Sequence, residues 1–481
     1  MVARSRTIGG PQLARLLGDL PGERPFYVAL ARAIRGLILD GGLALRVRLP
    51  AERDLAAALG VSRTTVTAAY DALRAESYIE SRQGAGSWTA LPRGHAAGRA
   101  PVAGAVLGTL EPEIDLGSAA PGAPEVFDEA VADAVARLPG YTAGPGYDPA
   151  GLGPLREAVA ERYTARGLST RPEQIVVTAG AQHALTLVLE ELMNPGDPVL
   201  VESPTYPHAL DALRRRGARL IPAGVNAGWD VELIATTMRQ TAVRIGYVNA
   251  DFHNPTGHLM DDERRAALVT AAKRCGAYLI ADETFTELAL DRPAVLPRPL
   301  GAYDPDGRII SVGSVSKLFW GGLRIGWIRT TPPLARRIAT LRESIDLASP
   351  VLEQLIVREL LLRVEEVRAE RVALLRASRD ALVAALGDRL PEWSCTVPAG
   401  GMSLWARLPG PLSSALAAAA ARLGVRVVPG PLFGVDGLLE DHVRLPYVQP
   451  PDVLRDAVER LSRAFRTVQT APAPRSLPSY V

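Results

Sequence analysis

The stretch Gly313-Ser-Val-Ser-Lys-Leu-Phe-Trp-Gly-Gly-Leu-Arg-Ile-Gly326 contains one of only two lysines in the chain. The other basic residues are all arginine, so Lys317 and Lys273 stand out against a strong compositional bias. Arginine cannot replace a lysine that must lose its proton and attack a carbonyl, because the guanidinium stays charged. Lys317 is therefore a candidate Schiff-base amine, and pyridoxal phosphate (PLP) is the commonest aldehyde for such a lysine. The alternative is an ordinary solvated lysine, which is the interpretation we give to Lys273.

The 481 residues are too many for one ordinary hydrophobic core, so the length predicts at least two domains. A content of 47% hydrophobic and 22% charged residues indicates a globular rather than a disordered chain. We assign residues 10–91 to a first domain and residues 113–468 to a second. Residues 92–112, which carry Pro and Gly without periodicity, are expected to be a linker, and residues 469–481 a disordered tail.

Charge and special residues exclude several classes of protein. The net charge is only +2, but residues 1–91 carry 12 Arg against 8 Asp and Glu. Two cysteines are too few for a disulfide framework, which suits a reducing cytoplasm. No apolar run is long enough for a membrane span, the N-terminus lacks the core of a signal peptide, and no metal-ligand spacing is present. The Ala, Arg, Gly and Pro bias suggests a GC-rich bacterial genome.

The second domain alternates apolar, strand-like runs with amphipathic helices. The clearest predicted strands are Ile175–Thr178, Pro198–Glu202, Ile245–Asn249, Tyr278–Asp282 and Ile309–Gly313. Strands that alternate with helices predict an α/β fold with a mostly parallel central sheet covered on both faces.

The first domain has the pattern of a winged helix-turn-helix. Phe26–Leu39 has apolar residues at helical spacing, and Leu49–Gly60 reads as a short helix that has a proline at its start and ends in glycine. Val61–Leu73 is a second helix, opened by Ser62 as its N-cap. Tyr78–Thr89 then reads as two strands around a glycine turn, which is the wing. Two helices joined by a tight turn indicate a DNA reader, and the alternative is a helical packing module without a ligand.

This segment resembles the winged helix-turn-helix of the GntR regulators, on the motifs Leu-Pro-Ala-Glu-Arg, Gly-Val-Ser-Arg-Thr-Thr-Val and Ala-Tyr-Asp-Ala-Leu. The resemblance implies contacts to double-stranded DNA from the following residues: Arg53, Ser62, Arg63, Thr64, Thr65, Gln83 and Gly84. Arg82 is a further candidate, because it lies near the tip of the predicted hairpin. Some family members carry arginine where Thr67 stands, so one phosphate or base contact is missing here.

The region from Ile114 to Arg466 resembles the fold-type I, class I/II aminotransferases. The motifs that carry the resemblance, besides the stretch around Lys317, are Thr178-Ala-Gly-Ala-Gln-His-Ala-Leu185, Glu202-Ser-Pro-Thr-Tyr-Pro207, Asn254-Pro-Thr-Gly257, Tyr278-Leu-Ile-Ala-Asp-Glu283, Gly146-Tyr-Asp-Pro-Ala-Gly151 and Asp441-His-Val-Arg-Leu-Pro-Tyr447. The resemblance implies a PLP cofactor in which Lys317 forms the internal aldimine. Asp282 keeps the pyridine nitrogen protonated and makes the ring an electron sink, Asn254 donates to the 3-oxygen, and Tyr206 stacks on the ring.

The same resemblance implies the phosphate ligands. Ser314, Ser316 and Arg324 hold the phosphate, together with the amides of Gly180, Ala181 and Gln182 at the positive end of a helix. Tyr147 matches a tyrosine that reaches the phosphate of the neighbouring subunit, which implies a homodimer with shared sites. His183 and His253 are interpreted as neighbours of working residues rather than as catalysts.

Two residues concern the ligand beyond the cofactor. Arg444 matches the arginine that clamps a substrate α-carboxylate, which makes an amino-compound effector possible. Many aminotransferases have a tyrosine three residues after the pyridine-pairing Asp, and here that position is Phe285. Loss of this donor is expected to weaken proton management during transamination without preventing PLP binding.

A GntR-type winged helix joined to an aminotransferase-like domain is the architecture of the MocR/GabR regulators, which this chain resembles along nearly its whole length. The resemblance implies a cytoplasmic, nucleoid-associated bacterial transcription factor that senses PLP or an amino compound through Lys317. We expect little or no catalytic turnover. Two alternatives remain, a working aminotransferase with a DNA-binding appendage and a DNA binder whose second domain holds no cofactor. The loop Gly400–Trp405, similar to the substrate-side loop of aminotransferases, favours the first of them.

Overall fold

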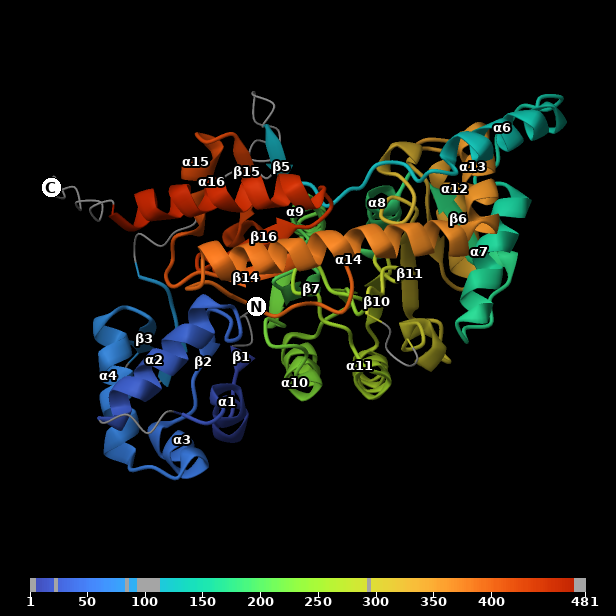
Figure 1. The fold of residues 1–481 in the computed structure, drawn as a ribbon. Coiled ribbons are helices and arrows are strands. Elements are labelled where there is room, and N and C mark those ends of the chain that lie inside the picture. Colours follow the sequence, from blue (N-terminus) through green and yellow to red (C-terminus); the bar gives the residue numbers. More distant parts are fainter. Residues whose placement is uncertain (1–5, 21–24, 83–85, 93–112, 292–295, 471–481) are drawn as a thin grey trace, which may run out of the picture.

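The computed structural model describes residues 6–20, 25–82, 86–92, 113–291 and 296–470. Its N-terminal part is a winged helix-turn-helix that lies below the C-terminal part in Figure 1. Its elements are β1 (Arg6–Thr7), α1 (Gly10–Leu17), α2 (Phe26–Leu39), β2 (Val47–Arg48), α3 (Glu52–Leu59), α4 (Arg63–Ala75), β3 (Ile79–Arg82) and β4 (Gly86–Thr89). The four strands pair in the order β1-β2-β4-β3.

Local chemistry explains the turn between α3 and α4. Gly60 ends α3 with φ +66°, a left-handed conformation that favours glycine. Ser62 caps α4, because its hydroxyl accepts a hydrogen bond from the amide of Thr65 at 3.1 Å. Pro50 was expected inside the first helix, but α3 begins two residues later, after the cap residue Ala51. The carbonyl of Pro50 instead accepts the Tyr70 hydroxyl and ties this turn to α4.

A seven-stranded sheet forms the centre of the C-terminal part. Its strands, in spatial order, are β6 (Ile175–Thr178), β12 (Gly326–Arg329), β11 (Ile309–Ser314), β10 (Tyr278–Asp282), β9 (Ile245–Val248), β7 (Pro198–Ser203) and β8 (Arg219–Gly224). All are parallel except β12, which is antiparallel to both of its neighbours. The predicted α/β fold with a mostly parallel sheet is confirmed, and the five predicted strands agree with these bounds to within one residue.

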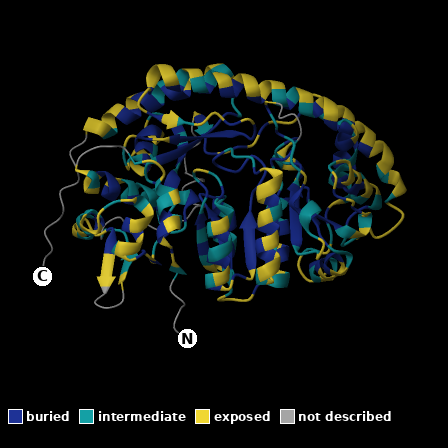
Figure 2. Ribbon diagram, turned by 90° about the horizontal axis from the view of Figure 1, so that it is seen from below, coloured by how far each residue is buried: buried dark blue, intermediate teal, exposed yellow. Residues whose placement is uncertain are grey.

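Helices cover both faces of this sheet, and in Figure 2 its strands are dark blue between helices that are exposed on their outer sides. One face packs on α8 (Ala181–Leu192), α9 (Pro207–Arg215) and α12 (Pro332–Arg342). The other face packs on α10 (Val231–Thr241) and α11 (Asp262–Cys275), and at its far end on α7 (Gly153–Ala165) and α13 (Val351–Leu362). Because the strands are buried on both sides, they are continuous apolar runs rather than alternating ones.

A second sheet lies beside the first, and the long helix α14 (Val364–Arg389) runs from one to the other in Figure 1. Its strands, in spatial order, are β13 (Ser394–Cys395), β14 (Ser403–Arg407), β16 (His442–Pro446), β15 (Val425–Pro429) and β5 (Ile114–Leu116). The helices α15 (Ser413–Ala421) and α16 (Pro451–Thr470) pack on it. The remaining helix, α6 (Phe127–Arg137), packs against α13.

The limits of the predicted domains remain expectations. Two details differ from them. The winged domain begins before residue 10, because β1 pairs with β2 of that domain, and α16 continues past residue 468. Residues 471–481 of the predicted tail and residues 93–112 of the predicted linker lie outside the described residues. None of the helices in the described part of the chain has the length and apolar character that a membrane crossing needs.

Candidate functional site

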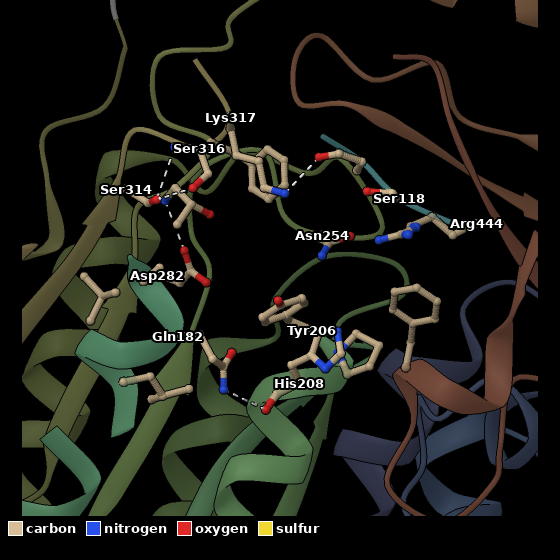
Figure 3. A pocket seen from close by; sticks show the side chains of 18 of the residues that line it. Ser118, Gln182, Tyr206, His208, Asn254, Asp282, Ser314, Ser316, Lys317 and Arg444 are labelled. Carbon is tan, nitrogen blue, oxygen red and sulfur yellow. Dashed lines mark hydrogen bonds between the residues drawn. The ribbon is translucent and has the colours of Figure 1, made fainter. Parts of the chain in front are cut away.

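A cavity of about 270 Å³ opens where the parallel strands end, the usual place for a ligand in such sheets. Figure 3 shows side chains from both sheets arranged around it. The predicted site residues that line it are Ala181, Gln182, Tyr206, Asn254, Asp282, Ser314, Ser316, Lys317, Arg324 and Arg444. Predicted site residues from Ala181 to Arg444 therefore meet in one pocket.

Lys317 lies in the loop after β11, and its Nζ donates to the carbonyl of Ala119 at 2.8 Å. Burial, with a further contribution from Arg444, lowers the pKa of this amine to about 8. A lysine whose pKa approaches neutrality is partly uncharged and can act as a nucleophile. By contrast, Lys273 is exposed on α11 and pairs with Asp306 at 3.0 Å, as an ordinary surface lysine does.

Asp282 ends β10, and both of its carboxylate oxygens are held. Oδ1 accepts the amide of Thr284 at 3.0 Å, and Oδ2 accepts the hydroxyl of Tyr247 at 2.5 Å. Burial, followed by the charge of Asp282, raises the pKa of Tyr247 well above its usual value, so the phenol stays a donor. Tyr247 is not part of any motif found in the sequence. It lies in the predicted strand β9, and a continuous apolar run does not indicate which face of the sheet each side chain occupies.

The other end of the pocket is built by backbone and basic groups. Gly180 precedes α8 with φ +91°, and a Cβ there would lie 2.6 Å from a guanidinium nitrogen of Arg324. Glycine is thus required for the close approach of Arg324 to the start of α8. The hydroxyls of Ser314 and Ser316 lie 3.0 Å apart beside it. A helix N-terminus, two hydroxyls and an arginine form a suitable site for a phosphate.

Arg444, on β16, faces the pocket from the smaller sheet. Its guanidinium donates to the carbonyl of Gly117 and lies 5.1 Å from the centre of the Phe433 ring. Burial lowers its pKa to about 10, so the group is still charged near neutral pH. Among the described residues no carboxylate pairs with this guanidinium, and its Nε has no hydrogen-bond partner. A buried, charged and incompletely paired guanidinium suits an anionic ligand.

Three buried polar atoms that lack partners belong to residues lining this pocket. They are Nε of Arg444, Oδ1 of Asn254 and Oε1 of Gln182. Buried polar groups in native proteins are almost always hydrogen-bonded, so such a cluster points to a polar ligand. A nucleophilic lysine, a carboxylate on the sheet and a phosphate site together fit pyridoxal phosphate.

The winged domain presents a second candidate site at the start of α4. Arg63 is 73% exposed, and its Nε lies 3.2 Å from Glu52, which also accepts the hydroxyl of Thr67. Arg53 is 83% exposed on α3. Ser62 and Thr64 are exposed, and their hydroxyls lie 2.8 Å apart. An exposed helix start with arginines and hydroxyls suits the major groove and phosphates of DNA.

Comparisons with known proteins identify families for both parts of the chain. The bacterial regulatory proteins of the gntR family match residues 26–88, and aminotransferase class I and II matches residues 117–461. The probable rhizopine catabolism regulatory protein MocR of Rhizobium meliloti is 33% identical over 66% of this chain and 68% of its own length. This chain belongs to the MocR-like family.

Similarity to other proteins extends over both parts of this MocR-like chain. The uncharacterized HTH-type transcriptional regulator YisV of Bacillus subtilis is 30% identical over 79% of this chain and 84% of its own. Among solved structures, the alpha-aminoadipate aminotransferase LysN from Thermus thermophilus, complexed with N-(5'-phosphopyridoxyl)-L-leucine, is 30% identical. It covers 74% of this chain and 92% of its own, with a TM-score of 0.68.

Other residues named from the sequence do not line this pocket. Tyr147 is 68% exposed and does not line the pocket of its own chain. His183 and His253 do not line it either. Gln83 and Gly84 lie outside the described residues. Arg82 ends β3 next to them, and Gly180 contributes its backbone at the start of α8.

Other residues of the pocket were not found from the sequence. His208 stands edge-on to Tyr206 at 5.3 Å, and burial lowers the pKa of its imidazole. Gly117, Ser118 and Ala119 follow β5 and form the wall opposite Lys317. No motif in the sequence pointed to this wall. No cluster of His, Cys, Asp and Glu in the described residues could hold a metal ion.

Proposed function

We propose that this protein is a PLP-dependent transcriptional regulator that binds operator DNA and senses PLP or an amino compound at Lys317. The observation that carries the proposal is the convergence of Lys317, Asp282 and Arg324 in one pocket of a chain that also carries a GntR-type domain. Lys317 would hold the aldehyde group of PLP, because burial keeps its amine partly uncharged and therefore nucleophilic. When bound, PLP supplies an electron sink for amino compounds.

We assign roles to the other pocket residues from the resemblance and from their places in the pocket. Asp282 pairs with the pyridine nitrogen, Asn254 with the 3-oxygen, and Tyr206 packs against the ring. The start of α8 with Ser314, Ser316 and Arg324 binds the phosphate. Arg444 binds the carboxylate of an amino-compound effector, since it is the buried cation at the opposite end of the pocket from the phosphate site.

The cofactor proposal is tested on the purified protein. We expect a visible absorbance band, and reduction with borohydride is expected to fix PLP on one residue. Mass spectrometry should locate the adduct at Lys317, with Lys273 as the internal control. An adduct at Lys273, or a protein that PLP cannot load, contradicts the proposal. Lys317→Ala is expected to fold and to lose the band.

We also propose that the regulator is a homodimer with PLP sites shared between subunits. Tyr147 is exposed, and so are Ile345 and Leu347, which are 50% and 47% exposed. The two segments adjoin, because Arg342 donates to the carbonyl of Pro149 at 2.9 Å. Exposed apolar side chains in one region favour a subunit contact. Light scattering should give twice the chain mass, and Tyr147→Ala should weaken PLP binding.

DNA binding is assigned to α3, α4 and the wing. The contacting residues in this proposal are Arg53, Ser62, Arg63, Thr64, Thr65, Arg82, Gln83 and Gly84. Arginines and hydroxyls at a helix start reach base edges and phosphates, whereas the wing lies along the backbone. Binding to a bacterial operator places the protein in the cytoplasm, on the nucleoid.

The second candidate function is a working aminotransferase, which the complete pocket and the likeness to aminotransferases favour. Phe285 argues against fast turnover, since it lines the pocket near Lys317 and has no hydroxyl to donate to the cofactor. Steady-state assays with amino acids and 2-oxoglutarate distinguish the two functions. Sustained turnover of many cycles per second would show that the protein is an aminotransferase and would contradict the proposed regulator.

A further inference from the structure

The winged domain contacts the C-terminal part through the end of α2 and the turn that follows it. We call Leu39–Gly42 the docking turn. At the end of β8, a Cβ on Gly224 would lie 2.6 Å from the carbonyl oxygen of Gly41 and 2.6 Å from Cα of Gly42. A Cβ on Gly41 would in turn lie 2.9 Å from Oγ of Ser203. The docking turn therefore lies directly against the main chain of the central sheet, where only glycines leave enough room.

A second contact holds the same turn from the smaller sheet. The amide of Leu439 donates to the carbonyl of Leu39, the last residue of α2, at 2.8 Å. Leu45 and Leu91 of the winged domain also pack on an apolar cluster there, composed of Trp405, Val428, Phe433, Leu438 and Leu439. The docking turn is thus held between the end of β7 and β8 on one side and the segment 430–441 on the other.

Both of these segments continue into the pocket. The chain from Ser203 leads to Tyr206, and the segment 430–441 contains Phe433, which lines the pocket beneath Arg444. The amide of Thr205 donates to the carbonyl of Phe433 at 2.9 Å and joins the two segments. A ligand that displaces Tyr206, Phe433 or Arg444 therefore also shifts the segments that contact the docking turn, which are the end of β7 and the segment 430–441.

Leu439 has a strained backbone at the point of contact. Its φ is +73°, in the left-handed region that a leucine rarely adopts, and its side chain is fully buried. Its carbonyl accepts the amide of His442, two residues before Arg444 on β16. Such strain persists only where the surroundings enforce it, and it is typical of elements that switch between two arrangements.

We propose that occupancy of the pocket is transmitted to DNA through the docking turn. A carboxylate-bearing ligand that binds Arg444 changes the contact between Arg444 and Phe433. The segment 430–441, which contains Phe433, then shifts and alters the hydrogen bond from the amide of Leu439 to the carbonyl of Leu39. Because α2 packs on α4, the helix that carries Arg63, α4 moves with the docking turn. This inference rests on the proposed function and names the path by which the same site regulates DNA binding.

The test uses Gly224→Val in the full-length protein. The new side chain forces the docking turn off β8, yet Gly224 lies neither in the pocket nor on the DNA surface. Gly36→Ala is the matched control, because it lies on α2 with no atom within 4 Å of the added Cβ. The probe is a DNA fragment selected in vitro with the wild-type protein. Its affinity is measured for PLP-free protein, for PLP-loaded protein, and for PLP-loaded protein with each of the twenty L-amino acids in turn.

For the wild type and for Gly36→Ala, we expect the DNA affinities of at least two of these ligand states to differ by about fivefold or more. For Gly224→Val, the DNA affinities of all states should agree to within about twofold. Gly224→Val should load PLP with the wild-type spectrum. Hydrogen exchange of the peptide around Leu39–Leu43 should vary with pocket occupancy in the wild type and stay fast in every state of the variant. If Gly224→Val does not fold, Leu45→Ala, which removes packing without a clash, replaces it under the same criteria.

Two negative outcomes are distinguishable. A Gly224→Val protein that keeps the full wild-type change in DNA affinity overturns the docking turn as the path, while the proposed function stands. A wild type whose DNA affinity is the same in all states overturns the proposed function, and this inference with it.

Discussion

The hydroxyl of Tyr247 donates a hydrogen bond to Oδ2 of Asp282 over 2.5 Å, on adjacent parallel strands. Both residues line the pocket, and the amide of Thr284 holds the second carboxylate oxygen. The orientation of the carboxylate that would meet the cofactor is therefore set by groups from β9 and from the loop after β10. Such partners behind a working residue fix its direction and tune its basicity.

Tyr247→Phe is expected to weaken PLP binding by about 10- to 150-fold, since a hydrogen bond to a charged group contributes about 1.5–3 kcal/mol. Removal of the hydroxyl frees the carboxylate to rotate away from the ring nitrogen. PLP titration followed by absorbance measures the effect. Tyr303→Phe is the control, because it removes a surface hydrogen bond between a tyrosine and Asp262. Equal PLP affinity in the two variants would show that Tyr247 does not contribute to PLP binding.

Covalent loading of PLP is expected to depend on pH through Lys317. Only the neutral amine attacks, and the pKa of Lys317 is lowered to about 8, chiefly by burial. The loading rate of PLP-free protein should rise with pH and level off above about 8, because the amine is then mostly deprotonated. Absorbance after mixing measures the rate, and Lys317→Arg is the control that should not load. A loading rate that keeps rising to pH 10 would show that Lys317 has the pKa of an ordinary lysine and would contradict this prediction.

Arg444→Ala is expected to keep PLP and to lose the response to carboxylate-bearing amines. Loss of a charge-assisted contact predicts an increase of about 10- to 150-fold in the half-saturating concentration of an amino acid. The cofactor spectrum during titration with amino acids reports this response. Arg444→Lys keeps the charge but not the bidentate geometry, so its response should be intermediate. An unchanged response in Arg444→Ala would show that the effector binds without Arg444.

Arg63→Ala is expected to weaken specific DNA binding by about 1–3 kcal/mol if Arg63 contacts a base, with a loss of preference at that base. Contact with a phosphate instead weakens binding to all sequences and reduces the salt dependence. Gel shifts at several salt concentrations separate these cases. Arg337→Ala, an exposed arginine on α12 paired with Glu191, is the control. A variant that matches the control in every assay would exclude Arg63 from the DNA contact.

Much of the fold could be predicted because its signals are local. The strand Tyr278–Asp282 and the helix Phe26–Leu39 are continuous apolar or periodic runs, and both have the predicted bounds in the structure. Lys317, Asp282 and Arg444 each lie in a motif whose residues are close in the chain. Since parallel strands place their carboxyl ends along one edge, motifs after successive strands must converge there.

Contacts between distant segments could not be read in this way. Lys317 and Ala119 are separated by 198 residues, and Arg444 and Gly117 by 327. The face on which Tyr247 lies and the seat of the docking turn beside Gly224 depend on how the sheets pack. The sequence by itself determined which elements form and which groups carry the chemistry, because hydrophobic periodicity, caps and residue types act locally. Only the tertiary structure decided which side chains hold those groups and how the winged domain meets the pocket, because packing joins segments that no local pattern relates.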